Sequence, residues 1–113
     1  MGQEQETYIP DIQDDTFSDS LKSPGLVLVY FYIPLVKTCL LMDPVIEVVA
    51  GDTKYKDKIK LYKLNAREHP KAVAAYNILS IPTLLVFKDE QVVATLPGTS
   101  RLKELRVDIE RHL

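Results

Sequence analysis

Residues 26–50 read LVLVYFYIPLVKTCLLMDPVIEVVA, and the expected architecture rests on the two elements in this segment. It begins with Leu26–Tyr32, a run of β-branched, aliphatic and aromatic residues that lacks the polar alternation of a half-exposed strand. Such a run is typical of a strand in a sheet that helices cover on both faces. Pro34 ends the strand, and from about Val36 the apolar spacing becomes helical. Pro44 predicts a kink in this helix, because proline removes a backbone donor. The apolar positions of the helix, three and four residues apart, are Cys39, Met42, Ile46 and Val49.

The composition is that of an ordinary globular domain. The chain has 113 residues, of which 46% are hydrophobic and 27% charged, and this length allows a single core. A net charge of −2 does not favour nucleic-acid or membrane partners. Since no apolar run could span a bilayer and the polar N-terminus is unlike a signal peptide, we expect a cytoplasmic protein. The single cysteine excludes an internal disulfide and a cysteine-based metal cluster, and we expect no cofactor.

The remaining signals divide into short strands and helices. Residues 1–6 are polar and are expected to form a disordered tail before a domain over residues 7–113. Thr7–Ile12 predicts an edge strand, because Pro10 cannot donate to a ladder. His69 is expected to cap the helix that begins at Pro70. The other expected elements are a helix over residues 14–22, strands over 59–64, 81–87 and 91–96, and a last helix from Thr99 or Ser100, whose buried face is Leu102, Leu105, Ile109 and Leu113.

From Leu26 onward these elements predict an α/β domain in the order βαβαββα, with a hairpin near the end. The expected architecture is a central mixed sheet of about five strands flanked by four helices.

The central stretch resembles the active-site segment of thioredoxin, in which a buried strand leads into a Trp-Cys-Gly-Pro-Cys turn and a proline-kinked helix. In this sequence Leu35 stands at the Trp position and Val36 at the first Cys. Lys37-Thr38 replaces Gly-Pro, and Cys39 stands at the second Cys. The resemblance implies a thioredoxin fold over nearly the whole chain.

Further residues extend the resemblance. Pro44 matches the helix-kink proline, and Tyr30 falls where the family has a buried acidic residue that assists proton transfer. Ile81-Pro82-Thr83 matches the loop whose proline is cis in the family and faces the reactive cysteine. Other matching landmarks are Leu64-Asn65, Tyr76-Asn77-Ile78 and Gly98.

Two parts of the redox machinery are absent from these positions. Dithiol exchange needs a low-pKa thiolate that attacks a disulfide and a second thiol that resolves the mixed disulfide. Val36 has no nucleophile, and Cys39 is expected to be a buried core residue rather than a working thiol. Tyr30 cannot readily act as a base near neutral pH, since the pKa of a phenol is about 10.

The expected function is therefore that of a redox-inactive thioredoxin-like protein that binds an unidentified protein or peptide. In the family, substrate polypeptide lies in a groove between the active-site loop and the cis-proline loop, and an apolar rim suits an extended peptide. The residues of this sequence that match the groove are Leu35, Val36, Lys37, Ile81, Pro82 and Gly98.

The alternative is an enzyme, an atypical monothiol oxidoreductase of the thioredoxin type that uses Cys39. Exposure of the Cys39 sulfur distinguishes the two, because a buried sulfur favours the binding module. We expect a monomer or a weak dimer.

Overall fold

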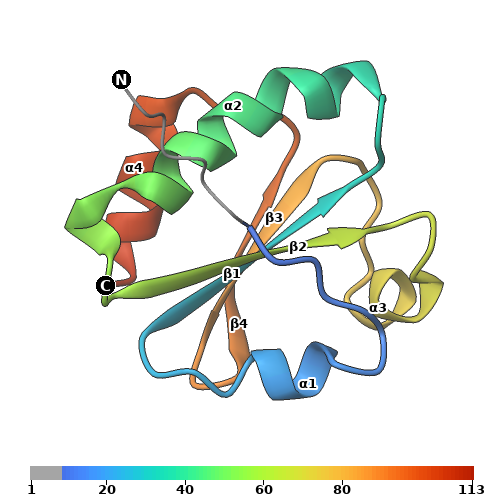
Figure 1. The fold of residues 1–113 in the computed structure, drawn as a ribbon, viewed down its shortest axis with the longest axis horizontal. Helices are drawn as coiled ribbons and strands as arrows, with labels where there is room; N and C mark the ends of the chain where they lie inside the picture. Colours follow the sequence, from blue (N-terminus) through green and yellow to red (C-terminus); the bar gives the residue numbers. More distant parts are fainter. Residues whose placement is uncertain (1–8) are drawn as a thin grey trace, which may run out of the picture.

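The computed structural model describes residues 9–113, and its elements follow the predicted alternation (Figure 1). The expected tail, and Thr7 and Tyr8 of the expected first strand, lie outside the described residues. The elements are α1 (Phe17–Ser20), β1 (Leu26–Tyr32), α2 (Lys37–Gly51), the 3₁₀ turn η1 (Thr53–Tyr55), β2 (Ile59–Asn65), α3 (Pro70–Ala75), β3 (Thr83–Lys88), β4 (Gln91–Pro97) and α4 (Leu102–Arg111). Among residues 9–113, no helix is long and apolar enough to cross a membrane.

The sheet is mixed and has the strand order β2-β1-β3-β4. β1 is parallel to β2, with Leu26 opposite Ile59 and Tyr32 opposite Asn65. β3 is antiparallel to both of its neighbours, β1 and β4. Figure 1 shows α2 and α4 on one face of the sheet and α1 and α3 on the other. β1 is thus covered on both faces, which explains why its first six residues are all buried.

Two apolar clusters follow from this layering, because side chains of a strand alternate between its faces. One cluster joins the sheet to α2 and α4, and it includes Leu28, Tyr30, Met42, Ile46, Leu105 and Ile109. The other joins the sheet to α1 and α3, and it includes Phe17, Val29, Phe31, Leu64, Ala72 and Phe87.

The sheet has four strands over residues 9–113, where the sequence predicted about five. The segment after Ile9 runs beside β2 but forms a single bridge, between Asp11 and Lys63. Its two hydrogen bonds run from the Lys63 N–H to the Pro10 carbonyl and from the Ile12 N–H to the Lys63 carbonyl, both 2.9 Å. Pro10 has no N–H to add to this ladder, which limits the pairing to one bridge.

Both terminal helices differ from the predicted boundaries. α1 ends at Ser20, before the expected Lys22. α4 begins at Leu102 instead of Thr99 or Ser100, because the Glu104 side chain accepts a hydrogen bond from the Arg101 N–H at 3.3 Å and fixes the first turn there. Leu113 lies beyond the helix and is 45% exposed, so it is not part of the buried face.

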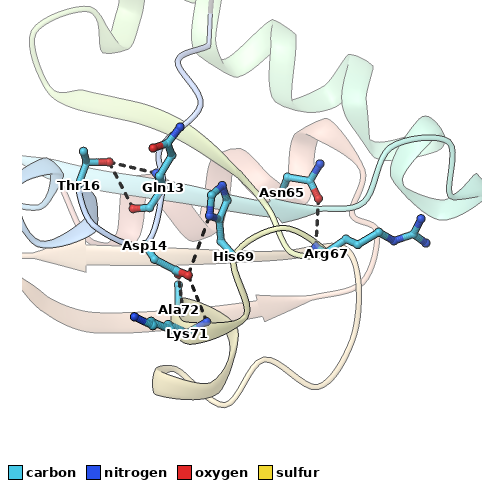
Figure 2. A network of polar contacts seen from close by, with 8 residues as sticks. All are labelled: Gln13, Asp14, Thr16, Asn65, Arg67, His69, Lys71 and Ala72. Carbon is cyan, nitrogen blue, oxygen red and sulfur yellow. Dashed lines mark hydrogen bonds and ion pairs between the residues drawn. The ribbon is translucent and has the colours of Figure 1, made fainter.

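The predicted His69 cap of α3 is wrong, and Asp14 provides the cap instead (Figure 2). The Asp14 carboxylate accepts hydrogen bonds from the Ala72 N–H at 2.9 Å and the Lys71 N–H at 3.4 Å. His69 holds the N-cap position, but its Nδ1 lies 4.0 Å from Asp14 Oδ2 and makes no cap bond. Asp14 thereby fastens the segment before α1 to the start of α3.

Asp14→Ala is expected to lower the free energy of unfolding by about 1–2 kcal/mol, because it leaves two N–H groups of α3 without their acceptor. Asp15→Ala is the matched control, since the neighbouring Asp15 is exposed and should change stability by less than about 0.5 kcal/mol. Urea unfolding measures both values. Equal stability of the two variants would show that the Asp14 cap contributes nothing.

Candidate functional site

Four loops meet at one end of the sheet because of the strand directions. β1 and β2 end there, β3 begins there and β4 ends there. The loops are held together by hydrogen bonds from the Ala66 N–H to the Tyr32 carbonyl at 2.8 Å and from the Gly98 N–H to the Pro82 carbonyl at 2.7 Å. This end holds all the residues predicted to bind a peptide.

The turn after β1 presents an apolar side chain on a strained backbone. Leu35 has φ of 68° and is 84% exposed. A non-glycine residue in the left-handed region costs on the order of 1 kcal/mol, and such residues gather at functional sites. Val36 is the N-cap residue of α2, where its side chain can accept no hydrogen bond. Lys37 follows as the first, exposed residue of the helix.

The predicted burial of Cys39 is confirmed. Its side chain, in the first turn of α2, is 1% exposed, and its Sγ accepts a hydrogen bond of 3.5 Å from the Ile33 N–H. Burial raises the pKa of the Cys39 thiol above its ordinary value, and the Ile33 hydrogen bond only partly opposes this shift. The sulfur therefore stays protonated and shielded near neutral pH.

Cys39 is expected to react with an alkylating reagent far more slowly in the native protein than in urea, because attack requires a solvated thiolate. Ellman's reagent or iodoacetamide, followed by mass spectrometry, measures both rates. Native labelling at the rate of a small free thiol would contradict the buried position and favour the monothiol enzyme.

Tyr30 is also buried, and its hydroxyl has the partners that a buried phenol requires. It donates to Asp43 Oδ1 at 2.8 Å and lies 3.2 Å from the Cys39 carbonyl oxygen. Burial and the neighbouring Asp43 carboxylate together raise the pKa of Tyr30 well above its ordinary value. Tyr30 therefore stays a neutral donor and cannot accept a proton from a thiol.

The loop before β3 faces the start of α2. The Ile81–Pro82 peptide bond is cis. A strand docked in the predicted groove would pair with the backbone N–H and carbonyl of Ile81, and only one of these two groups is without a partner within residues 9–113. The Thr38 hydroxyl donates to the Ile81 carbonyl at 3.2 Å, whereas the Ile81 N–H has no partner within residues 9–113. Ile81 is half-buried and Pro82 is buried.

Gly98 closes the other side of the loop cluster with φ of 78°, and a Cβ added there would meet no atom within 4 Å. The space beside Gly98 is therefore open. The predicted set of Leu35, Val36, Lys37, Ile81, Pro82 and Gly98 thus lies on three loops joined by the Thr38–Ile81 and Gly98–Pro82 hydrogen bonds.

Sequence reasoning missed four residues of this site. Leu79, in the connector before Ile81, is 86% exposed. Leu40 and Leu41 project from the first turns of α2 and are 51% and 63% exposed. The signal for Leu79 was present, since an apolar residue in a short connector has no strand or helix face to bury it. Thr38 was treated only as part of the replaced Gly-Pro pair.

The described chain has further polar features and a cavity away from this loop cluster. Residues 9–113 contain no group of three or more His, Cys, Asp or Glu side chains that could hold a metal ion. Two surface lysines make ion pairs, with Lys54 2.7 Å from Glu110 and Lys63 3.9 Å from Asp11. A surface cavity of about 400 Å³ lies at the opposite end of β1, where it is lined by Gly25, Leu26, Asp57, Lys58, Lys88, His112 and Leu113.

Comparison with known proteins supports the resemblance. The thioredoxin family model matches residues 9–111. The chain is 37% identical to the thioredoxin of Staphylococcus saprophyticus over 105 residues, covering 93% of this chain and 98% of that protein. It is 38% identical to the M-type chloroplastic thioredoxin of Chlamydomonas reinhardtii over 103 residues, covering 90% of this chain and 72% of that protein. The structure of Malassezia sympodialis thioredoxin superposes with a TM-score of 0.85 at 24% identity, covering 99% and 96% of the two chains.

Proposed function

Because this chain belongs to the thioredoxin family, we propose that it is a member without dithiol–disulfide exchange that binds an extended protein segment. The segment lies in the groove between the Leu35–Lys37 turn and the Ile81–Pro82 loop. The proposal has two parts, a lost activity and a retained surface, and each rests on different residues.

The observation that carries the first part is the single cysteine. One thiol cannot form the intramolecular disulfide that dithiol exchange produces, and the attacking position holds Val36. The remaining sulfur, Cys39, is buried with a raised pKa, and Tyr30 supplies no carboxylate to accept its proton. The same burial opposes a monothiol enzyme, which needs an accessible thiolate.

The second part rests on the loop cluster. Leu35 and Leu79 are the two most exposed large apolar residues of the described chain, and the Thr38–Ile81 hydrogen bond brings their loops together. Between these loops the Ile81 N–H offers a backbone donor. Apolar side chains beside an unpaired backbone donor suit a strand-like segment, whose main chain pairs while its side chains contact the rim.

A random nonapeptide display library selected on the wild-type protein tests the proposal. Leu35→Ser is expected to lower the affinity for the selected peptides about tenfold or more, because burying a leucine contributes roughly 1.5–3 kcal/mol. Val107→Ser is the matched control, since Val107 is 54% exposed on α4, outside the four loops. Equal affinities of Leu35→Ser and wild type for every peptide would contradict the proposed groove.

A further inference from the structure

The hydroxyl of Thr38 occupies an acceptor that a docked segment would otherwise use. Thr38 is the second residue of α2, and its Oγ1 donates across 43 positions of sequence to the Ile81 carbonyl at 3.2 Å. Thr38 is exposed and Ile81 is half-buried, so this hydrogen bond lies at the surface of the loop cluster. The hydroxyl is this chain's own feature at the position where the Trp-Cys-Gly-Pro-Cys pattern has proline, which has no donor.

The Thr38 hydroxyl makes the backbone N–H and the carbonyl of Ile81 differ in their ability to bind a docked segment. In an antiparallel hydrogen-bonded pair, each residue donates its N–H to the carbonyl of the other. The Ile81 N–H has no partner within the described chain, so it can donate to the carbonyl of a docked residue. The Ile81 carbonyl already accepts from Thr38, so a second donor adds less there than it would to a carbonyl without one.

We propose that Thr38 determines specificity in this groove. Its hydroxyl donates to the Ile81 carbonyl in place of the N–H of the partner residue that pairs with Ile81. The partner class is then an extended apolar segment that needs a carbonyl at that residue but no N–H. Proline meets this description, since it keeps its carbonyl, lacks an N–H and is tolerated at sheet edges. The inference rests on the proposed peptide groove and names what the groove accepts.

The placement of the two leucines agrees with such a partner. Leu35 precedes Thr38 by three residues, and Leu79 precedes Ile81 by two, so the apolar rim that they form is close in sequence to both partners of the hydrogen bond. A proline ring is apolar and would contact this rim without leaving a polar group unpaired. An ordinary residue at the same place would bring an N–H that finds the Ile81 carbonyl already bonded.

The test uses three forms of the intact chain, namely wild type, Thr38→Val and Thr38→Ser. Valine keeps the branched shape without the donor, and serine restores the donor. The ¹³C shift of the Ile81 carbonyl in the free protein reports the Thr38 bond directly. It should move in Thr38→Val and return in Thr38→Ser.

The binding probe is a peptide from the nonapeptide library in which any proline is first replaced by alanine, because proline has no N–H to methylate. Each residue of this peptide is then N-methylated in turn. At one position, N-methylation should change affinity less than twofold for wild type and Thr38→Ser but weaken it about fivefold for Thr38→Val, the equivalent of one net hydrogen bond. If N-methylation lowered peptide affinity equally in all three proteins at every position, the role of Thr38 would be overturned, while the proposed groove would stand. Failure of the library to yield any peptide would overturn both proposals.

Discussion

The wild-type protein is expected to give no turnover above background in an insulin disulfide-reduction assay driven by dithiothreitol or by thioredoxin reductase. Val36 cannot attack a disulfide, and the Cys39 thiol is 1% exposed with its pKa raised by burial. The buried base is missing as well, because the Tyr30 hydroxyl donates a hydrogen bond to Asp43 and its raised pKa keeps it protonated.

A thioredoxin with both cysteines serves as the positive control, and Cys39→Ser as the negative one. The rate of the wild-type protein should equal that of Cys39→Ser. A wild-type rate well above background that disappears in Cys39→Ser would contradict the loss of activity and support the monothiol alternative.

Val36→Cys is expected to create a dithiol that oxidises to an intramolecular disulfide. Val36 is the N-cap residue of α2 and Cys39 lies three residues later, so the two side chains are neighbours on one face. A thiol at position 36 also lies at the positive end of the helix, which lowers its pKa. After mild oxidation, titration of Val36→Cys in urea should find no free thiol.

Val48→Cys is the matched control for this disulfide. Val48 is an exposed residue of the same helix, nine positions from Cys39, and that separation exceeds the reach of a disulfide. Both of its thiols should survive the same oxidation. Two surviving thiols in Val36→Cys would mean that the start of α2 is misplaced.

The disulfide reductase activity of Val36→Cys should rise above that of wild type but stay limited. The new thiolate can attack a substrate disulfide, and Cys39 can resolve the product. Tyr30 still provides no carboxylate to take the Cys39 proton, and its raised pKa keeps the phenol protonated.

Sequence periodicity predicted the central strand and the helix that covers it. Leu26–Tyr32 and the helix around Pro44 have strong local patterns, and tertiary packing reinforces these patterns. The segment after Ile9 was predicted as an edge strand but forms a single bridge, because its pairing depends on how many of its N–H groups can donate to β2. Local pattern alone does not report that number.

Contacts between distant residues could not be predicted in the same way. Asp14 and Ala72 are 58 positions apart, so the cap of α3 by Asp14 is visible only once α1 packs beside α3. His69 was chosen because it is adjacent in sequence, which is the usual location of a cap. The Tyr30–Asp43 bond is hidden for a similar reason, since it joins a strand to the helix that covers it.

The candidate site was predicted where a residue's position in the chain fixes its place, as for Leu35, Val36 and Cys39. It was incomplete where a side chain's role depends on the loop that faces it. Thr38 was known as a helix residue, but its bond to Ile81 depends on how α2 and the loop before β3 pack. Leu79 became part of the site only when its exposure was known.

An amide chemical-shift titration of the ¹⁵N-labelled protein with a library-selected peptide tests the central claim most directly. The account predicts that the largest changes fall on Leu35, Lys37, Ile81 and Gly98, with the Ile81 amide shifting as its N–H gains a carbonyl acceptor. The opposite end of β1, at Gly25, Lys58 and His112, should be unaffected. Changes confined to that opposite end, or an Ile81 amide that does not shift at saturation, would contradict the account.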